Sequence, residues 1–206
     1  MPSVDTRAIR RGATRARILG AAWEAARRDG VAALSLHDIA QRVGMRAPSL
    51  YTYFVSKNAL FDAMYVAGAQ ELAATLARRP EGIDPHETLC AQVRLFIDFC
   101  TTDPIRYQLL FERPIPGFEP TRDSFGITVN ALAGTRADLD AAGVHGERAL
   151  DLFRALITGL ISLQIANDPG GERWTRLQDA ALEMFLAHHA RLASEAGDDD
   201  MREVLG

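Results

Sequence analysis

The side chains of this sequence that are best suited to chemistry lie close together, between residues 35 and 57. Ser35, Tyr51 and Tyr53 carry hydroxyl groups. Arg46 carries a guanidinium group, and Lys57 is the only lysine of the chain. Hydroxyl, guanidinium and ammonium groups donate hydrogen bonds to anionic oxygens, and an arginine that reaches a base edge can pair with guanine. The predicted chemistry is therefore recognition of a polyanion.

The sequence contains no pattern that is typical of an enzyme. It has no His/Cys/Glu cluster with metal-ligand spacing, no Gly-rich phosphate loop and no G-x-S-x-G motif. His188 and His189 are adjacent, so on a helix they point about 100° apart and cannot hold one ion together. We predict no catalytic residue, no metal site and no cofactor.

Composition is that of an ordinary globular protein, with 48% hydrophobic and 24% charged residues in 206. No apolar run approaches the roughly 18 residues that span a bilayer, and the first residues lack the apolar segment of a secretory signal. We therefore expect a cytoplasmic protein with no membrane partner. Cys90 and Cys100 are separated by about 15 Å of helical rise, beyond the reach of a disulfide, so we expect reduced thiols.

Charge is distributed unevenly along the chain. Residues 1–58 carry nine arginines and one lysine against four acidic residues, a net charge of +6, so the remainder must carry −10 to give the total of −4. A basic N-terminal region on an acidic body is expected when one end of a protein binds nucleic acid. The arginines at positions 7, 10, 11, 15 and 17 are expected either to add minor-groove or phosphate contacts or to form a disordered solubilising segment.

Apolar residues recur at helical spacing throughout, and no segment alternates as a strand does, so the predicted fold class is all-α. Ser35 is placed to cap one helix, Asp84 with Pro85 to begin another, and Gly30 and Gly44 to end helices. A Pro- and Gly-rich loop is expected over 113–120. The expected helices cover 14–29, 35–43, 48–54, 56–79, 84–100, 103–111, 121–141, 147–166 and 172–194.

The two short helices at 35–43 and 48–54, joined by a tight turn that contains Gly44, are typical of a helix-turn-helix. In this motif the second helix enters the major groove of DNA, and flanking groups contact phosphates. Each polar residue has an ordinary structural role when taken alone, but together their spacing favours DNA contact. The residues expected to bind DNA are Ser35, His37, Arg46, Ala47, Pro48, Ser49, Tyr51, Thr52, Tyr53 and Lys57.

The segment LSLHDIAQRVGMRAPSLYTYFVSKNAL, residues 34–60, resembles the DNA-binding region of the TetR family of regulators. The matching elements are Ser35, Ile39-Ala40, Val43-Gly44-Met45, Leu50-Tyr51, Tyr53-Phe54, Ser56-Lys57 and Ala59-Leu60. The resemblance covers residues 14–62 well. Residues 107–125 and the helix at 153–163 resemble a subgroup with related C-terminal domains, although Thr158 stands where that subgroup usually has His.

This resemblance implies a nine-helix fold whose N-terminal helix-turn-helix domain precedes a ligand-binding and dimerisation domain. We expect a basic arm over 1–13, the DNA-binding domain over 14–55, the second domain over 56–196 and a flexible acidic tail over 197–206. The family's small-molecule pocket lies in the C-terminal domain, and most residues assigned to it here can also be core. By resemblance the pocket residues are Tyr65, Phe96, Phe99, Cys100, Leu110, Phe111, Phe125, Val129, Leu156 and Gly159.

The last two expected helices carry surplus apolar surface, and the first of them is apolar nearly all round. Surplus of this kind suggests a homodimer interface, although a central helix in a monomer has the same pattern. The residues expected at the interface are Phe153, Ile157, Leu160, Ile161, Gln164, Leu177, Ala181, Met184, Phe185 and His188.

The resemblance implies a homodimeric repressor that binds a palindromic double-stranded operator and is released by a small-molecule effector. Few charges fall on the predicted inner faces, which favours an apolar ligand. Two alternatives remain open at this point, a ligand-independent or architectural DNA-binding protein and an activator with the same fold.

Overall fold

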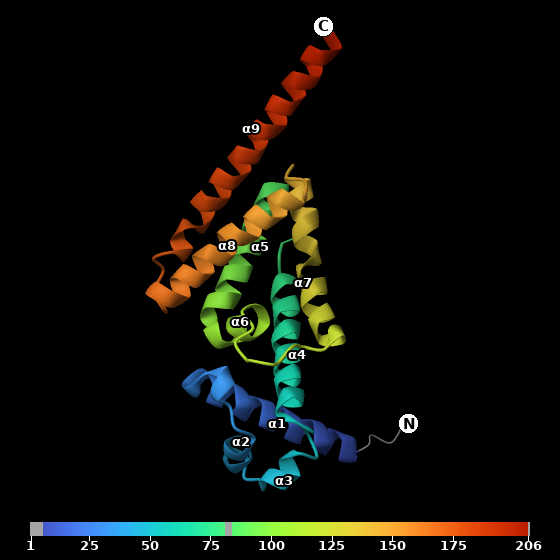
Figure 1. Ribbon diagram of the computed structural model, residues 1–206, viewed down its shortest axis with the longest axis vertical. Coiled ribbons are helices and arrows are strands. Elements are labelled where there is room, and N and C mark those ends of the chain that lie inside the picture. The colour runs from blue at the N-terminus through green and yellow to red at the C-terminus, as the bar shows by residue number, and fades with distance from the viewer. Residues whose placement is uncertain (1–5, 81–83, 206) are drawn as a thin grey trace. The chain divides into compact units, whose positions relative to one another are not determined.

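The computed structural model describes residues 6–80 and 84–205, and all regular secondary structure in this part is helical, as predicted (Figure 1). Nine α-helices and two short 3-10 helices follow one another along these residues. They are α1 (Thr6–Asp29), η1 (Val31–Ala33), α2 (Leu36–Arg42), α3 (Ala47–Leu50), α4 (Lys57–Leu76), α5 (Pro85–Thr102), α6 (Pro104–Phe111), α7 (Arg122–Ala141), α8 (Glu147–Asn167), η2 (Thr175–Leu177) and α9 (Gln178–Leu205).

Local capping explains where several helices begin and end. The Ser35 hydroxyl accepts a hydrogen bond from the Asp38 backbone N–H at 3.4 Å, which confirms the predicted N-cap of α2. The Asp84 carboxylate accepts from the backbone N–H of His86 at 2.9 Å at the start of α5. Gly44 follows α2 with φ +70°, a left-handed conformation that a side chain would strain. The sequence predicted these boundaries correctly because capping depends on neighbouring residues alone.

Two helices extend further than the sequence predicted. Helix α1 begins at Thr6 rather than near Thr14, because Arg and Ala, which favour helix, make up most of its first turns and support a helix without a buried stripe. Helix α9 runs from Gln178 to Leu205 rather than over 172–194, so the backbone of the expected flexible tail over 197–205 is helical. It starts late because Gln164 accepts hydrogen bonds from the backbone N–H groups of Trp174 and Thr175, which hold the preceding segment outside the helix.

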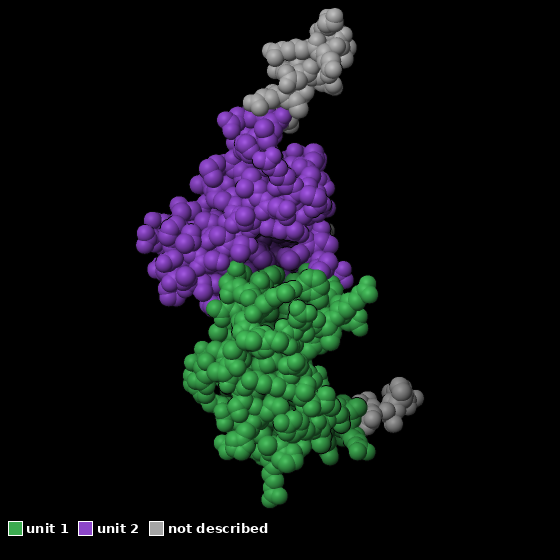
Figure 2. All heavy atoms as spheres, in the orientation of Figure 1, with its two compact units in different colours: residues 1–71, 105–128 green, residues 72–104, 129–206 purple. Residues whose placement is uncertain are grey.

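The chain divides into two compact units (Figure 2). Unit 1 consists of residues 1–71 and 105–128, and unit 2 of residues 72–104 and 129–206. This division differs from the predicted boundary after residue 55, because the first three-quarters of α4, almost all of α6 and the start of α7 belong to the same unit as the helix-turn-helix. Contacts between segments far apart in the sequence decide such a boundary.

Unit 1 has a continuous apolar core beneath α1, α2 and α3. Ile18, Ile39 and Leu50 are fully buried, and Phe54 is 1% exposed. Farther along unit 1, Arg106 of α6 is buried and forms an ion pair with Glu71 of α4. A short α3 can persist because Leu50 anchors it in this core.

In unit 2, α5 packs against α8 and α9, and α8 packs against α9. The rings of Phe153 and Phe185 lie 5.7 Å apart in this core. Arg79 at the end of α4 forms an ion pair with the buried Asp138 of α7 and donates to Gln92 at 2.8 Å. Burial raises the pKa of Asp138, and the charge of Arg79 opposes that effect. Among the described residues, Asp103, Arg106 and Asp138 are the buried charged residues, so buried charges are few, as expected from the sequence.

Helix α8 is the one helix in the described part of the chain that is long and apolar enough to cross a membrane, judged by length and composition only. A core helix meets the same test, and a third of its apolar window is buried in the protein. The prediction that no apolar segment approaches this length was therefore too strict, because it counted uninterrupted runs and Arg154 interrupts this one.

Candidate DNA-binding site

The candidate site is the helix-turn-helix of α2 and α3, which lies within unit 1. The turn is closed by a hydrogen bond from the Met45 N–H to the Ala40 carbonyl at 2.8 Å. Arg46 occupies the N-cap position of α3 with extended backbone, and Pro48 lies in the first turn of the helix, where its missing N–H costs nothing. Leu50 points inward, so the opposite face of α3 is presented to solvent.

That outer face carries most of the side chains predicted to bind DNA. His37 at the start of α2 is exposed as well, and its ring shares a 2.9 Å hydrogen bond with Gln41. Tyr51 is 50% exposed, so its hydroxyl is available to an external acceptor. Ser35, Ala47, Tyr53 and Lys57 are half-buried, and the exposed ones are His37, Arg46, Pro48, Ser49, Tyr51 and Thr52.

Lys57 has partners inside unit 1 that the sequence did not reveal. Its amine donates to the Ala32 carbonyl at 3.4 Å and lies 5.3 Å from the centre of the Phe61 ring. The long bond and the partial exposure leave N–H groups of this ammonium available at the start of α4. Lys57 therefore links η1 to α4 and can still donate to an anion.

Of the basic arm expected over 1–13, residues 6–13 are part of helix α1, and residues 1–5 lie outside the described residues. The arginines at positions 7, 10, 11, 15 and 17 are all exposed. A helix fixes the direction in which each guanidinium projects, which a disordered segment does not. The sequence suggested this only weakly, since the spacing of four residues between Arg7, Arg11 and Arg15 places them along one side of a helix.

The ten residues expected to line a ligand pocket are divided between the two units. Tyr65, Leu110, Phe111 and Phe125 belong to unit 1, and Phe96, Phe99, Cys100, Val129, Leu156 and Gly159 to unit 2. Phe125 is 52% and Val129 49% exposed, whereas Tyr65 is 1% exposed. The Tyr65 hydroxyl accepts a hydrogen bond from Thr128 at 2.9 Å, and burial raises its pKa. Cys90 and Cys100 form no disulfide, as predicted.

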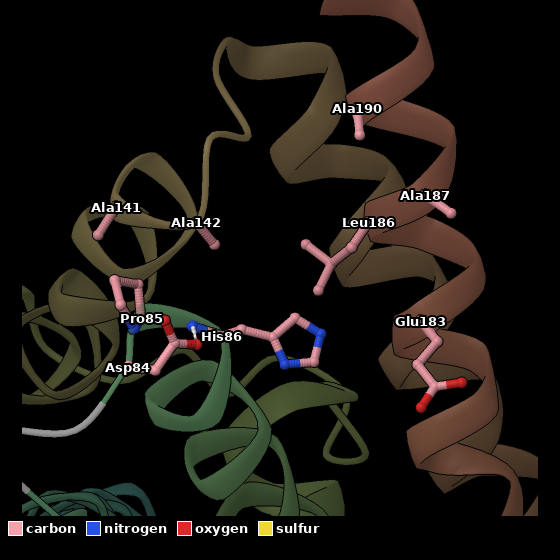
Figure 3. A pocket seen from close by; sticks show the side chains of 9 residues that line it. All are labelled: Asp84, Pro85, His86, Ala141, Ala142, Glu183, Leu186, Ala187 and Ala190. Atoms are coloured by element: carbon pink, nitrogen blue, oxygen red, sulfur yellow. Dashed lines mark hydrogen bonds between the residues drawn. The ribbon is translucent and has the colours of Figure 1, made fainter.

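A pocket of about 480 Å³ lies in unit 2 and contains none of those ten residues (Figure 3). The His86 ring extends into it from the start of α5, and its Nδ1 atom lies 3.6 Å from the Cys90 sulfur. Burial raises the pKa of Cys90, which favours the thiol over the thiolate. The lining residues are Asp84, Pro85, His86, Ala141, Ala142, Glu183, Leu186, Ala187 and Ala190.

The residues expected at a dimer interface are placed partly inside unit 2. Leu177 and Met184 are exposed, at 41% and 66%, and Ala181 and His188 are half-buried. The other six are buried within the chain, because α5 and α9 cover that side of α8. These six are Phe153, Ile157, Leu160, Ile161, Gln164 and Phe185. The sequence did not predict that Leu152 and Leu163 of α8 are exposed. Because this helix is apolar nearly all round, its pattern does not show which side faces outward.

Comparison with known proteins bears directly on the helix-turn-helix. The model of the family of bacterial regulatory proteins described as the tetR family matches residues 18–64, which include α2, α3 and the start of α4. An HTH-type transcriptional regulator of Mycobacterium tuberculosis is 30% identical over 118 residues, or 56% of this chain. That alignment covers 50% of the relative, so the chain spans about half of its length.

The chain is therefore similar to the TetR family over residues 18–64, its helix-turn-helix region.

Solved structures extend the similarity beyond the helix-turn-helix. A regulatory protein of known crystal structure is 27% identical, with a TM-score of 0.73 over 90% of this chain and 100% of that one. Two further structures share the fold. FadR from Bacillus subtilis, solved with stearoyl-CoA, has a TM-score of 0.65 at 14% identity, covering 83% and 97% of the two chains. RolR, solved with resorcinol, has a TM-score of 0.55 at 16% identity, and the match covers 90% of this chain and 89% of RolR.

Proposed function

We propose that this chain is a one-component transcription regulator that binds double-stranded operator DNA as a homodimer and is released by a small molecule. One observation carries the proposal. The outer side of α3 and its flanks present hydrogen-bond donors in the order of a TetR family helix-turn-helix, with Arg46 and Tyr51 exposed. Arg46 can pair with guanine, Thr52 can contact a thymine methyl group, and Tyr51 and Lys57 can donate to phosphates.

A dimer is supported by a stripe of residues on α8 that the side chains described by the structure leave exposed or half-buried. Leu152, Leu156, Gly159 and Leu163 follow one another at spacings of four, three and four residues, so they share one side of the helix. Leu152 is 46% and Leu163 39% exposed. A contiguous exposed apolar surface of this kind marks an interface. We call these four residues the α8 stripe.

Met184 and Leu177 add exposed apolar surface from η2 and α9, which pack against α8. A two-fold axis through this region buries the α8 stripe of each protomer against its partner. The operator then mirrors the protein symmetry, with two half-sites whose centres lie about 34–36 Å apart, one turn of DNA.

The effector is proposed to be small and largely apolar. Members of the fold have been solved with ligands as different as stearoyl-CoA and resorcinol, so the fold is compatible with diverse ligands. The buried charges Arg106 and Asp138 each have an ion-pair partner in the chain, which leaves apolar surface for a ligand. Helix α4, which contributes residues to both units, is the proposed lever of release.

Two alternatives make different predictions from the same structure. A ligand-independent or architectural protein binds DNA with no response to any small molecule, and an activator binds the operator but raises transcription. We favour a repressor, because an operator-bound dimer obstructs transcription unless a ligand releases it.

The proposal is tested by measuring the binding of the purified chain to two DNA samples, a pool of random-sequence duplexes and DNA from upstream of its own gene. A scrambled duplex is the control for each, and each measurement is repeated across a series of salt concentrations. Selective binding that weakens steeply with salt is the expected result. Equal affinity for all duplexes, in protein refolded to remove any co-purified ligand, refutes an operator-binding function. Release of the selected duplex by a small molecule distinguishes a ligand-responsive regulator from an architectural one.

A further inference from the structure

Three arginines of α1 contact backbone carbonyls of the helix-turn-helix. We call Arg11, Arg15 and Arg17 the arginine clamp. Arg11 donates to the Thr52 carbonyl at 2.9 Å, and Arg15 donates to the Tyr53 carbonyl at 3.1 Å. Arg17 donates to the carbonyl of Val43, the C-cap residue of α2, at 3.1 Å. The clamp thus reaches the ends of both helices of the motif.

Two members of the clamp also lie over aromatic rings. The guanidinium carbon of Arg11 is 5.5 Å from the centre of the Tyr53 ring, and that of Arg15 is 4.3 Å from the centre of the Phe54 ring. A cation over a ring face is attracted by the ring quadrupole. Arg11 and Arg15 therefore each contact the segment after α3 twice, through a carbonyl and through a ring.

The clamp has a physical reason in the shortness of α3. That helix has only four residues, so it has little cooperative stability of its own. The carbonyls of Thr52 and Tyr53 lie just beyond its C-terminal end, where backbone carbonyls carry partial negative charge. On a DNA surface, bare carbonyls in this position would face the negative charge of the phosphates. A guanidinium group satisfies the carbonyl and replaces its negative charge with a positive one.

We propose that Arg11 and Arg15 are positioning residues for DNA recognition, holding residues 51–54 so that Tyr51 and Thr52 face the duplex. This inference rests on the proposed DNA-binding function. It differs from the simpler role of an arginine in a basic segment, which is to neutralise a phosphate directly. A phosphate contact strengthens binding to every sequence about equally, whereas a positioning residue strengthens binding to the operator more than to other DNA.

The test compares two neighbouring arginines that carry the same charge. Arg11→Gln removes one positive charge and the clamp contacts, while the matched control Arg10→Gln removes one positive charge only. Arg10 is exposed, and its guanidinium has no hydrogen bond or ion pair with any residue that the structure describes. Fluorescence anisotropy measures the affinity of each variant for the duplex that the wild type enriches from a random pool and for a scrambled duplex, across a salt series.

We expect both variants to change the salt slope, the slope of log affinity against log salt concentration, by the same amount of at most about 0.9, because each loses one charge. Arg11→Gln should in addition lose about tenfold in the ratio of selected to scrambled affinity, the effect of one charge-assisted hydrogen bond. Arg15→Gln should behave in the same way. Arg11→Lys keeps the charge but not the planar fork, so it should restore the salt slope and only part of the selectivity.

Several results would overturn the proposal. If Arg11→Gln matches Arg10→Gln in selectivity, or if Arg11→Lys restores selectivity fully, Arg11 acts by charge alone. The melting temperature of each variant shows whether it is folded, and a variant that binds scrambled DNA as Arg10→Gln does has retained its phosphate-binding surface. A wild type that enriches no duplex overturns the proposed function itself, and the clamp's role with it.

Discussion

Two glycines inside helices give a direct test of the proposed dimer. Gly20 lies in α1 and Gly159 in the α8 stripe, and a Cβ atom added at either would meet no described atom within 4 Å apart from the backbone of its own helical turns. An alanine therefore fits both positions without a clash. It should stabilise the folded protomer by about 0.8–1.0 kcal/mol at each, because glycine in a helix costs that much relative to alanine.

The two variants should differ in thermal stability only if a second copy of the chain packs against α8. For Gly20→Ala we expect the melting temperature to rise by about 2–4 °C, the shift that 1 kcal/mol produces in a chain of this size. For Gly159→Ala we expect a smaller rise or a fall, because the new methyl group occupies space that the partner's helix uses. The measurement is thermal unfolding at several protein concentrations, together with sedimentation equilibrium.

The interface assignment depends on the second measurement. A weaker dimer in Gly159→Ala, with an unchanged dimer in Gly20→Ala, supports a close helix contact at Gly159. Equal stabilisation of both variants and unchanged self-association would refute the reasoning, since the space beside Gly159 would then be open in the dimer as well as in the protomer.

Three further predictions concern α9, α4 and pH. Met184 is 66% exposed, so Met184→Glu should change the stability of the protomer by no more than about 0.5 kcal/mol. It should nevertheless dissociate the dimer, because two-fold symmetry would bury one added charge from each protomer. Sedimentation equilibrium measures the dimer, and Ile9→Glu, at a 58% exposed position of α1, is the control. A Cβ at Gly68 would lie 3.3 Å from Cγ of Arg106, so Gly68→Leu should displace α6. If α4 is the lever, this variant should change the release of DNA by the ligand. An unchanged response in a DNA-release assay would count against α4 as the lever. Burial and the neighbouring His188 lower the pKa of His189, so the unfolded chain binds more protons than the folded one, and the free energy of unfolding should fall as pH drops through about 6.5 and below. Denaturant unfolding at several pH values should show a smaller fall for His189→Phe than for the wild type. An equal fall in both would exclude His189 as its cause.

The sequence by itself determined the local features of this protein. The N-cap at Ser35, the left-handed turn at Gly44 and the apolar positions Ile39 and Leu50 each depend on residues only a few places away. These features define a helix-turn-helix and its exposed side. For the same reason, the similarity to the TetR family could be predicted from residues 34–60 alone.

Tertiary structure decided which side of an apolar helix remains outside and which distant residues meet. Helix α8 is apolar nearly all round, so only the packing of α5 and α9 shows that Phe153 is buried and Leu152 exposed. Arg11 and Thr52 are 41 residues apart, and no periodicity in the sequence links them. Contacts of this kind depend on how whole helices pack, because the core fixes their relative direction while the sequence fixes only their period.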